Sequence, residues 1–173
     1  IRKKKVLTFA DLQQEYLTEF FSQDELDHRK RSYEPSTMEA NQIISISDFT
    51  RKGLVEKYNI PKSKITTIHL SYNDALFKPA QNNLKVRNEQ YFIFPAGRWK
   101  HKNHKRLIDA FSVVLKKHPG VRLKLTGTIQ DQDDAISDQI ASQGINNSVD
   151  FLGHISEKEL PGLYQNAMGL VFP

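Results

Sequence analysis

Residues 91–126 read YFIFPAGRWKHKNHKRLIDAFSVVLKKHPGVRLKLT. The segment opens with Tyr91–Pro95, a short apolar run typical of a buried strand. Apolar residues then recur with the i, i+1, i+4, i+7 and i+8 spacing of an amphipathic helix, at Leu107, Ile108, Phe111, Val114 and Leu115. Pro119 and Gly120 end this helix, and 121–126 forms a second apolar run. A strand, a helix and a strand in this order predict a right-handed crossover between parallel strands.

The same alternation continues toward the C-terminus. We predict a polar helix over 131–143, a strand over 149–152 and a last strand over 169–173. Ser156–Glu159 has the S-x-x-E form of a capping box, which predicts a helix that opens there. The inward side of that helix is expected to hold Leu160, Leu163, Tyr164 and Ala167.

Toward the N-terminus the alternation is also visible. We predict a strand over 43–47, a helix over 48–58 with Ser47 as its N-cap, and a strand over 65–70. The helix is expected to place Phe49, Leu54 and Tyr58 on one side. Strands that alternate with helices throughout the chain indicate the α/β class, with Rossmann-like parallel sheets and flanking helices.

The first forty residues are less regular, although Ser22–Glu25 is a second capping box and predicts a helix over 26–38. Residues 71–90 are polar and have no period; they include Asn73, Pro79, Asn82 and Asn83. Such a stretch is typical of a linker. We therefore predict two domains, 1–75 and 76–173.

Composition sets the broad class of protein. The chain has 173 residues, is 38% hydrophobic and 26% charged, and has a formal charge of +5. These values indicate a globular protein, and the charge alone is too small to argue for nucleic acid. The absence of cysteine excludes a disulfide framework, thiol catalysis and a thiolate zinc site. No apolar run is long enough to span a bilayer, and Ile1–Lys5 does not open a secretory signal, so we expect a cytoplasmic protein.

The loop after Tyr91–Pro95 is the first candidate site, because parallel sheets bind ligands at the carboxyl ends of their strands. Gly97 permits unusual backbone angles and the close approach of a ligand. Arg98, a planar fork, and Lys102, a compact charge, are expected to converge on a phosphate beside the first N–H groups of the next helix. This arrangement suits a diphosphate leaving group. A solvated basic turn is the alternative, since 91–108 contains no acidic residue.

Two further glycines follow predicted strands. Gly127 is placed either to let a ligand approach or simply to make a tight turn. Gly153 also lies at a strand end, and the backbone of His154 or Ile155 is a candidate for contact with a nucleobase edge.

Metal and acid–base sites are less favoured. His101 and His104 are three apart, but no Asp, Glu or Cys lies near them, and His154 has no partner at ligand spacing. Asp11 and Glu15 are four apart and would share a helix face as an acid–base pair does; an ordinary polar loop and helix start is the favoured alternative. No G-x-S-x-G, Walker A or G-x-G-x-x-G motif is present.

Several stretches resemble the motifs of one family, in the family's order. Asp11–Gln13 with Glu19–Phe21 resembles "HDLQH…PEFF", 43–50 resembles "VIAVSEFT", Phe77–Pro79 matches "F.P", 96–111 resembles "GR…KN…RLIEAF", and 151–167 resembles "FLG.V…EL..LY..A". By these motifs the chain is identified as a member of the group 1, or family 4, retaining glycosyltransferases. The resemblance implies a GT-B fold, in which two Rossmann-like domains face a cleft.

The resemblance also implies what each part does. Residues 76–173 would belong to the domain that binds a nucleotide-diphosphate sugar, and 1–75 to the acceptor side. Arg98 and Lys102 would stabilise the departing diphosphate in place of a metal ion, so no cofactor is expected. The implied substrate-binding positions are Gly97, Asn103, Gly127, Gly153, His154 and Ile155. The implied reaction is sugar transfer, with retention, to a hydroxyl acceptor, either a saccharide or a lipid-linked molecule, in polysaccharide or glycoconjugate synthesis.

The family's E-x7-E segment normally follows the strand that ends here at Pro173. We therefore expect the chain to be an internal piece, incomplete at both ends, of a protein about twice as long, and to be inactive alone. Contact of Arg2–Lys5 with the inner face of a membrane is a further possibility in the parent protein, and a solvated charge run is its alternative.

Three other functions stay open. Ala10 stands where many family members have His, which favours a non-catalytic nucleotide-binding or scaffold module. A nucleotide-sugar epimerase shares the fold. Nucleic-acid binding through the basic loop is the least favoured, because Trp99 is the only aromatic residue in the loop and a stacking platform needs more.

Overall fold

The computed structural model describes residues 3–79, 89–128 and 134–173. These residues form two compact units, Ile1–Tyr72 and Asn73–Pro173. The division lies close to the boundary that the polar stretch predicts after residue 75. Asn82, Asn83 and Asp131, which entered the sequence predictions, lie outside the described residues.

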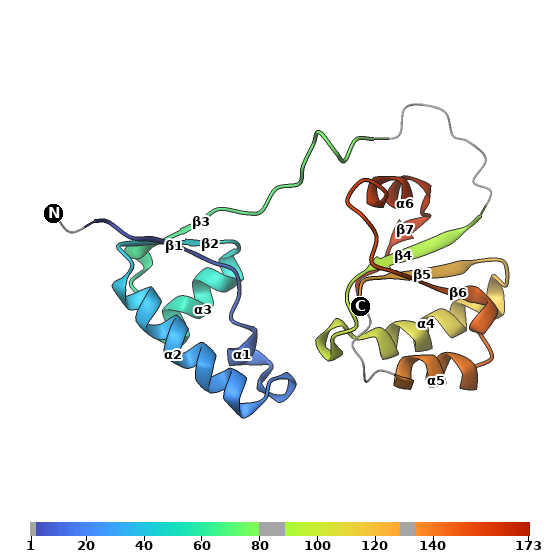
Figure 1. The fold of residues 1–173 in the computed structure, drawn as a ribbon, viewed down its shortest axis with the longest axis horizontal. Helices are drawn as coiled ribbons and strands as arrows, with labels where there is room; N and C mark the ends of the chain where they lie inside the picture. The colour runs from blue at the N-terminus through green and yellow to red at the C-terminus, as the bar shows by residue number, and fades with distance from the viewer. Residues whose placement is uncertain (1–2, 80–88, 129–133) are drawn as a thin grey trace. The chain divides into compact units, whose positions relative to one another are not determined.

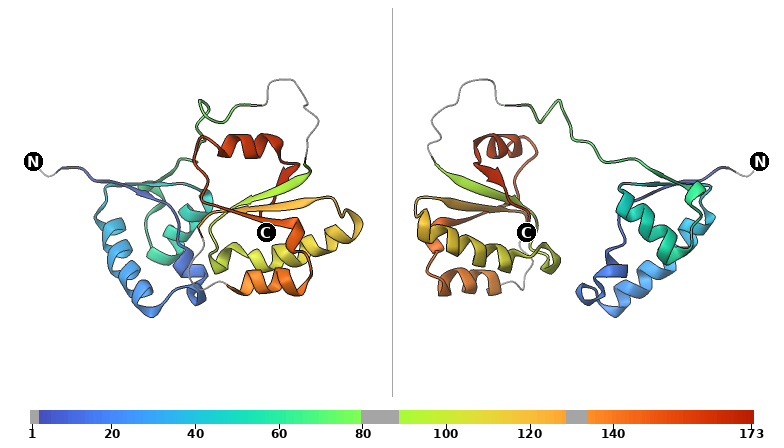
Figure 2. Two further views of the ribbon diagram at one scale, coloured as in Figure 1. Left: turned by 45° about the vertical axis from the view of Figure 1, so that its right-hand side comes forward. Right: turned by 180° about the vertical axis from the view of Figure 1, so that it is seen from behind.

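Unit 1 is a three-stranded parallel sheet in the order β1-β2-β3, with β1 at Val6–Phe9, β2 at Gln42–Ser45 and β3 at Ile65–Thr67. Two long helices connect the strands and lie on the same face of the sheet (Figures 1 and 2), namely α2 (Gln23–Glu39) and α3 (Asp48–Tyr58). The core between sheet and helices contains Phe9, Ile43, Leu54 and Ile65. A short helix, α1 (Gln13–Tyr16), follows β1.

Both predicted N-caps of unit 1 are confirmed. The Ser22 side chain accepts a hydrogen bond from the Glu25 backbone, and the Glu25 carboxylate accepts one from the Ser22 backbone at 2.8 Å. Ser47 Oγ accepts a hydrogen bond from the Thr50 backbone at 3.0 Å. These polar side chains accept hydrogen bonds from helix N–H groups that have no partner within the helix.

Three expectations for unit 1 need correction. Strand β1 was not predicted, because only Phe9 of its residues is buried and the apolar pattern is too short to detect. Phe49 is 64% exposed. It precedes Leu54 by five positions, about 140° around a helix, so the two cannot share a side. The third strand ends at Thr67 rather than 70, and the Ile68 N–H donates to the Ser45 carbonyl of β2 just after that end.

Unit 2 is a four-stranded parallel sheet in the order β6-β5-β4-β7, with β4 at Tyr91–Pro95, β5 at Arg122–Thr126, β6 at Val149–Gly153 and β7 at Gly169–Leu170. Figure 1 shows two helices on one face, α4 (His104–Lys117) and α5 (Asp134–Ser142), and α6 (Leu160–Asn166) on the other. Alternate residues of β4 serve both faces. Phe94 packs in the core with α4 and α5, while Tyr91 and Ile93 pack with the α6 side.

The helices of unit 2 change face because the connections change direction. From β4 the chain moves outward to β5 and β6, and it then returns across the sheet to place β7 on the other side of β4. A change of direction of this kind leaves a crevice at the carboxyl ends of the two strands that flank it, which here are β4 and β7.

Strand β4 and helix α4 confirm the pattern in the opening segment. Three element boundaries later in unit 2 differ from their predicted positions. Ser156 and Glu159 do pair, with Ser156 Oγ donating to the carboxylate at 2.6 Å, but they form a turn and α6 begins only at Leu160. Pro161 fits that first helical turn because it has no N–H to satisfy. The last strand is limited to Gly169–Leu170, the residues that pair with β4. The described part of the helix predicted over 131–143 is Asp134–Ser142.

Candidate functional site

Residues 96–103 connect β4 to α4 at the carboxyl edge of the unit 2 sheet. Lys100–Lys102 form one turn of 3-10 helix, in which the Lys102 N–H donates to the Trp99 carbonyl at 2.9 Å. Asn103 then adopts a left-handed conformation, with φ of 59°, and the chain enters α4. The predicted basic loop is therefore an ordered connection that lies at the carboxyl edge of the sheet.

The start of α4 has no side-chain cap. Its N-cap residue, Asn103, makes no hydrogen bond to the first turn through its side chain. The first turn of a helix exposes N–H groups and a partial positive charge, and both favour an anion. The helix end nearest the crevice between β4 and β7 thus has donors that no N-cap side chain occupies.

Lys102 lies on the β7 side of this edge. Its side chain is half-buried, and its Nζ is 5.9 Å from the centre of the Phe172 ring, just beyond β7. The Phe172 ring in turn packs edge-on against Phe94 of β4, with 6.0 Å between ring centres. These contacts place the Lys102 ammonium at the strand ends where the sheet changes direction.

Arg98 lies on the β6 side. It is only 8% exposed, and its guanidinium carbon is 3.9 Å from the centre of the Phe151 ring. Its backbone N–H donates to the Thr128 carbonyl at 3.5 Å, just after β5. The structure brings Arg98 and Lys102 to the same edge, where Arg98 lies over Phe151 of β6 and Lys102 lies near Phe172, just after β7. Their convergence on one phosphate stays a prediction.

The glycines of the edge differ in what they do. Gly127 has φ of 102°, and a Cβ there would lie 2.7 Å from the Ala96 carbonyl group. Its N–H donates to the Gly153 carbonyl at 2.7 Å, and Gly153 has φ of 67°. Gly97, in contrast, has no positive φ, so the unusual backbone expected there is wrong; its Cβ would instead crowd Trp99 at 3.3 Å. Glycine is required where the exits of β4, β5 and β6 touch.

The remaining predicted positions also lie at this edge. Asn103 and Ile155 are half-buried and His154 is exposed, and the latter two directly follow β6. Contact of these residues with a nucleotide stays a prediction. Phe151 and Phe172 were not singled out from the sequence, since aromatic residues at strand ends are usual in a core.

Acidic groups of the unit 2 sheet lie at its other end. Arg122, at the start of β5, forms an ion pair with Asp150 of β6 and another with Glu89 at 3.0 Å. The hydrogen bonds from Arg122 lower the pKa of Asp150 below its ordinary value, and Asp150 raises the pKa of Arg122. Lys124 pairs with Glu89 as well. Ionic contacts therefore fix the amino ends of the strands.

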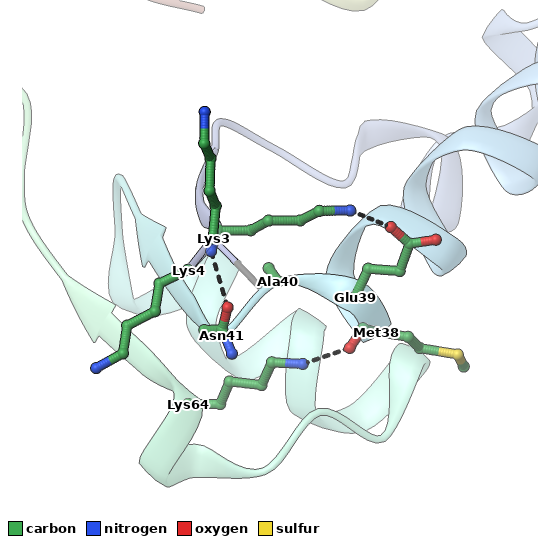
Figure 3. Close-up of a pocket in the computed structure, with 8 residues that line it drawn as sticks. Lys3, Lys4, Met38, Glu39, Ala40, Asn41 and Lys64 are labelled. Atoms are coloured by element: carbon green, nitrogen blue, oxygen red, sulfur yellow. Dashed lines mark hydrogen bonds and ion pairs between the residues drawn. The ribbon is translucent and has the colours of Figure 1, made fainter. Parts of the chain in front are cut away.

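A cavity of about 670 Å³ lies in unit 1 at the amino ends of its strands. Figure 3 shows why its lysines do not make an anion site. Lys5 pairs with Glu39 at 2.6 Å, and Lys64 donates to the Met38 carbonyl at 2.7 Å, where it caps α2. The side chains of Lys3 and Lys4 diverge, and membrane contact through this segment stays a prediction.

The acid–base pair considered for Asp11 and Glu15 does not form. Asp11 precedes α1 and accepts a hydrogen bond from the Gln13 backbone at 3.2 Å. Glu15 accepts one from the Tyr58 hydroxyl at 3.0 Å. Both carboxylates therefore hold local structure. Among the described residues no three His, Asp or Glu side chains gather as a metal site, and no helix is long and apolar enough to cross a membrane.

Comparison with known proteins identifies the family. A family model described as glycosyl transferases group 1 matches residues 77–173, more than half of the chain. The chain belongs to the group 1 glycosyl transferases. Among curated relatives, O-antigen chain mannosyltransferase B of Escherichia coli is 23% identical over 180 residues, which cover 99% of this chain and 47% of that protein. Mannosylfructose-phosphate synthase of Agrobacterium fabrum is 26% identical over 163 residues, covering 86% and 35% respectively. The chain thus spans between about a third and a half of the length of these relatives.

Solved structures agree on the fold. HepE of Anabaena, crystallised with UDP and glucose, is 21% identical with a TM-score of 0.77, over 98% of this chain and 46% of that one. Sucrose-phosphate synthase of Thermosynechococcus elongatus is 21% identical with a TM-score of 0.74, and the match covers 97% of this chain and 44% of that one. These likenesses confirm the predicted GT-B class of fold, with its Rossmann-like parallel sheets and flanking helices.

Proposed function

We propose that this group 1 glycosyl transferase moves a sugar from a nucleotide-diphosphate donor to a hydroxyl acceptor, with retention, in polysaccharide or glycoconjugate synthesis. One observation carries the proposal: Lys102 and the uncapped start of α4 lie together at the strand ends where the unit 2 sheet changes direction. A cation beside the first N–H groups of a helix in such a crevice is suited to a diphosphate.

The chemistry follows from where charge develops. The bond between the sugar's anomeric carbon and the diphosphate oxygen breaks, and its electron pair leaves with the nucleoside diphosphate. A new bond forms from the acceptor hydroxyl oxygen to the same face of that carbon, and the hydroxyl proton is released. Lys102, Arg98 and the first N–H groups of α4 favour this step because they stabilise negative charge that increases on the leaving group.

The comparisons support the substrate class. HepE was crystallised in complex with UDP and glucose and, in a second structure, in complex with UDP-glucose. The names of the curated relatives describe mannose transfer and the synthesis of mannosylfructose phosphate. We extend the nucleotide-sugar donor and the sugar-bearing or lipid-linked acceptor to this protein on that basis, together with the roles of Gly97, Asn103, Gly127 and the Gly153–Ile155 segment.

Binding of nucleoside diphosphates tests the site. Calorimetry with UDP, GDP and ADP should detect at least one ligand, and Lys102→Ala should weaken that affinity about tenfold, the effect of one charged contact. Lys100→Ala is the matched control, because Lys100 is an exposed lysine of the same 3-10 turn. Equal losses in the two variants would indicate only a diffuse basic surface, and an unchanged affinity in Lys102→Ala would remove this site.

We also propose that the protein needs no metal ion, because fixed cations and helix N–H groups would take that role. Nucleoside diphosphate affinity should then be the same, within about twofold, in EDTA and in added Mg²⁺ or Mn²⁺. A large gain with either ion would contradict this part of the proposal.

A non-catalytic nucleotide-binding module is the second candidate function, because the chain has Ala10 at the end of β1 where many family members have His. Binding alone does not separate the two. An assay of the longer parent protein with donor sugars and hydroxyl acceptors does, and the anomeric proton of the product, measured by NMR, reports retention. A changed donor sugar without transfer would instead indicate an epimerase.

A further inference from the structure

Arg98 is an unusual charged residue in this chain. Of the described lysines, arginines, aspartates and glutamates, only Arg98 is buried, at 8% exposure. Burial of a guanidinium has a high free-energy cost unless other groups compensate for the lost water. Neighbouring groups must therefore help to hold Arg98 in its buried position.

The residue beneath Arg98 is Phe151. The guanidinium carbon lies 3.9 Å from the ring centre, well within the range of a cation–π contact. Phe151 itself is 37% exposed. Phe151 pairs with Leu125 in the sheet, and the register then shifts so that Thr126 pairs with Gly153. Strand β6 thus presents this ring at the edge where the loop after β4 passes.

Two contacts link Arg98, in the loop after β4, to the segments of β5 and β6, which lie to one side of β4 in the sheet order β6-β5-β4-β7. Its backbone donates to Thr128, after β5, and its side chain lies on Phe151, in β6. An aromatic ring contacts the flat face of a guanidinium, whereas hydrogen bonds to an anion run along the N–H edge. A ring beneath the guanidinium therefore helps to hold it in place without using the N–H edge that binds phosphate, and it adds no negative charge beside an incoming diphosphate.

From this geometry we infer that Phe151 is a positioning residue of the donor site, which acts on nucleoside diphosphate binding through Arg98. The inference rests on the proposed function. Lys102 over Phe172 repeats the arrangement with a longer distance, 5.9 Å, so the effect is expected to be larger at Phe151.

A double-mutant cycle tests the inference, with calorimetry of whichever of UDP, GDP and ADP binds the wild-type protein best. Phe151→Leu keeps an apolar side chain but removes the aromatic face, and it should weaken affinity about threefold to tenfold. Phe151→Tyr keeps the face and should stay within about twofold of wild type. In an Arg98→Met background, Phe151→Leu should cause no further loss, because the residue through which it acts is gone.

The outcomes separate the two proposals. If the wild type binds none of the three nucleotides, the proposed function fails and this inference with it. If the wild type binds and Phe151→Leu binds equally well, or loses the same affinity with and without Arg98, only the positioning role is overturned. Circular dichroism checks the fold of each variant, and Phe151→Met replaces Phe151→Leu in the cycle if the latter unfolds.

Discussion

Helix α3 of unit 1 and helix α4 of unit 2 begin in opposite ways. In unit 1, β2 ends at Ser45 and α3 begins at Asp48, with Ser47 Oγ bound to the Thr50 N–H at 3.0 Å. In unit 2, residues 96–103 separate β4 from α4, and α4 has no side-chain cap. Unit 1 therefore satisfies its own helix start, whereas unit 2 keeps helix donors and two cations at the edge of its sheet.

This difference shows how one architecture supports both structure and binding. A short connection with a Ser cap uses the helix N–H groups for stability. A longer basic connection leaves them for an anion, and the fold must hold that connection by other means. In unit 2 those means are backbone contacts between strand exits and aromatic rings beneath the cations.

The largest effect is expected where the exits of the unit 2 strands touch. Gly127→Ala would place a Cβ 2.7 Å from the Ala96 backbone at a φ of 102°. We expect a loss of about 3 kcal/mol or more in the free energy of unfolding, measured with urea. Gly144→Ala is the matched control, since it also has a positive φ, 67°, but no atom within 4 Å of the added Cβ. It should cost about 1 kcal/mol, and equal losses would refute the close approach as the cause.

The second effect concerns the amino end of the unit 2 sheet. Asp150→Asn should lower the free energy of unfolding by about 2 kcal/mol at pH 7, because Arg122 loses its half-buried ionic partner. The pKa of Asp150 is lowered in the folded state, so its contribution is present above the ordinary pKa and disappears as pH falls through the lowered value. In thermal unfolding, the difference in stability between wild type and variant should be smaller at pH 3 than at pH 7, and a constant difference would argue against the ion pair.

The third effect is in unit 1, where ionisable groups are used in packing. The Tyr58 hydroxyl donates to Glu15 and accepts from Gln14 at 3.1 Å, so Tyr58→Phe should cost about 1.5 kcal/mol at pH 8. Burial, and then the hydrogen bond to Glu15, raise the pKa of Tyr58. This contribution is therefore present below the ordinary pKa and is lost as pH rises through the raised value. Between pH 8 and pH 11, the free energy of unfolding measured with urea should fall less in Tyr58→Phe than in the wild type. An equal fall in the two proteins would contradict this account.

Local patterns were sufficient to predict most of the fold. The run Tyr91–Pro95 and the spacing of Leu107 and Phe111 identified β4 and α4, and Ser22 and Ser47 identified two helix starts. Each of these signals lies within one turn or one strand. Strand β1 gave no such signal, because its stability comes from pairing with β2, whose partner residues lie 36 positions further along the chain.

The candidate site was predictable in position but not in detail. The place of Arg98 and Lys102 at a strand end follows from the order of elements. The contacts of Arg98 with Phe151 and of Lys102 with Phe172 join residues that are distant in sequence. The need for glycine at Gly127 instead of Gly97 likewise depends on how three strand exits meet. Tertiary contacts of this kind leave no local pattern.

The smallest effect tests the opening contrast directly. Ser47→Ala should lower the free energy of unfolding of unit 1 by about 1 kcal/mol, because it removes the side chain that caps α3. Asn103→Gly is its counterpart at α4. It removes no capping bond and relieves a left-handed asparagine, so we expect it to be neutral within about 0.5 kcal/mol or slightly stabilising. Urea unfolding followed by circular dichroism measures both variants. If Asn103→Gly cost as much as Ser47→Ala, α4 would depend on its N-cap side chain after all, and the donors at its start would not be reserved for a ligand.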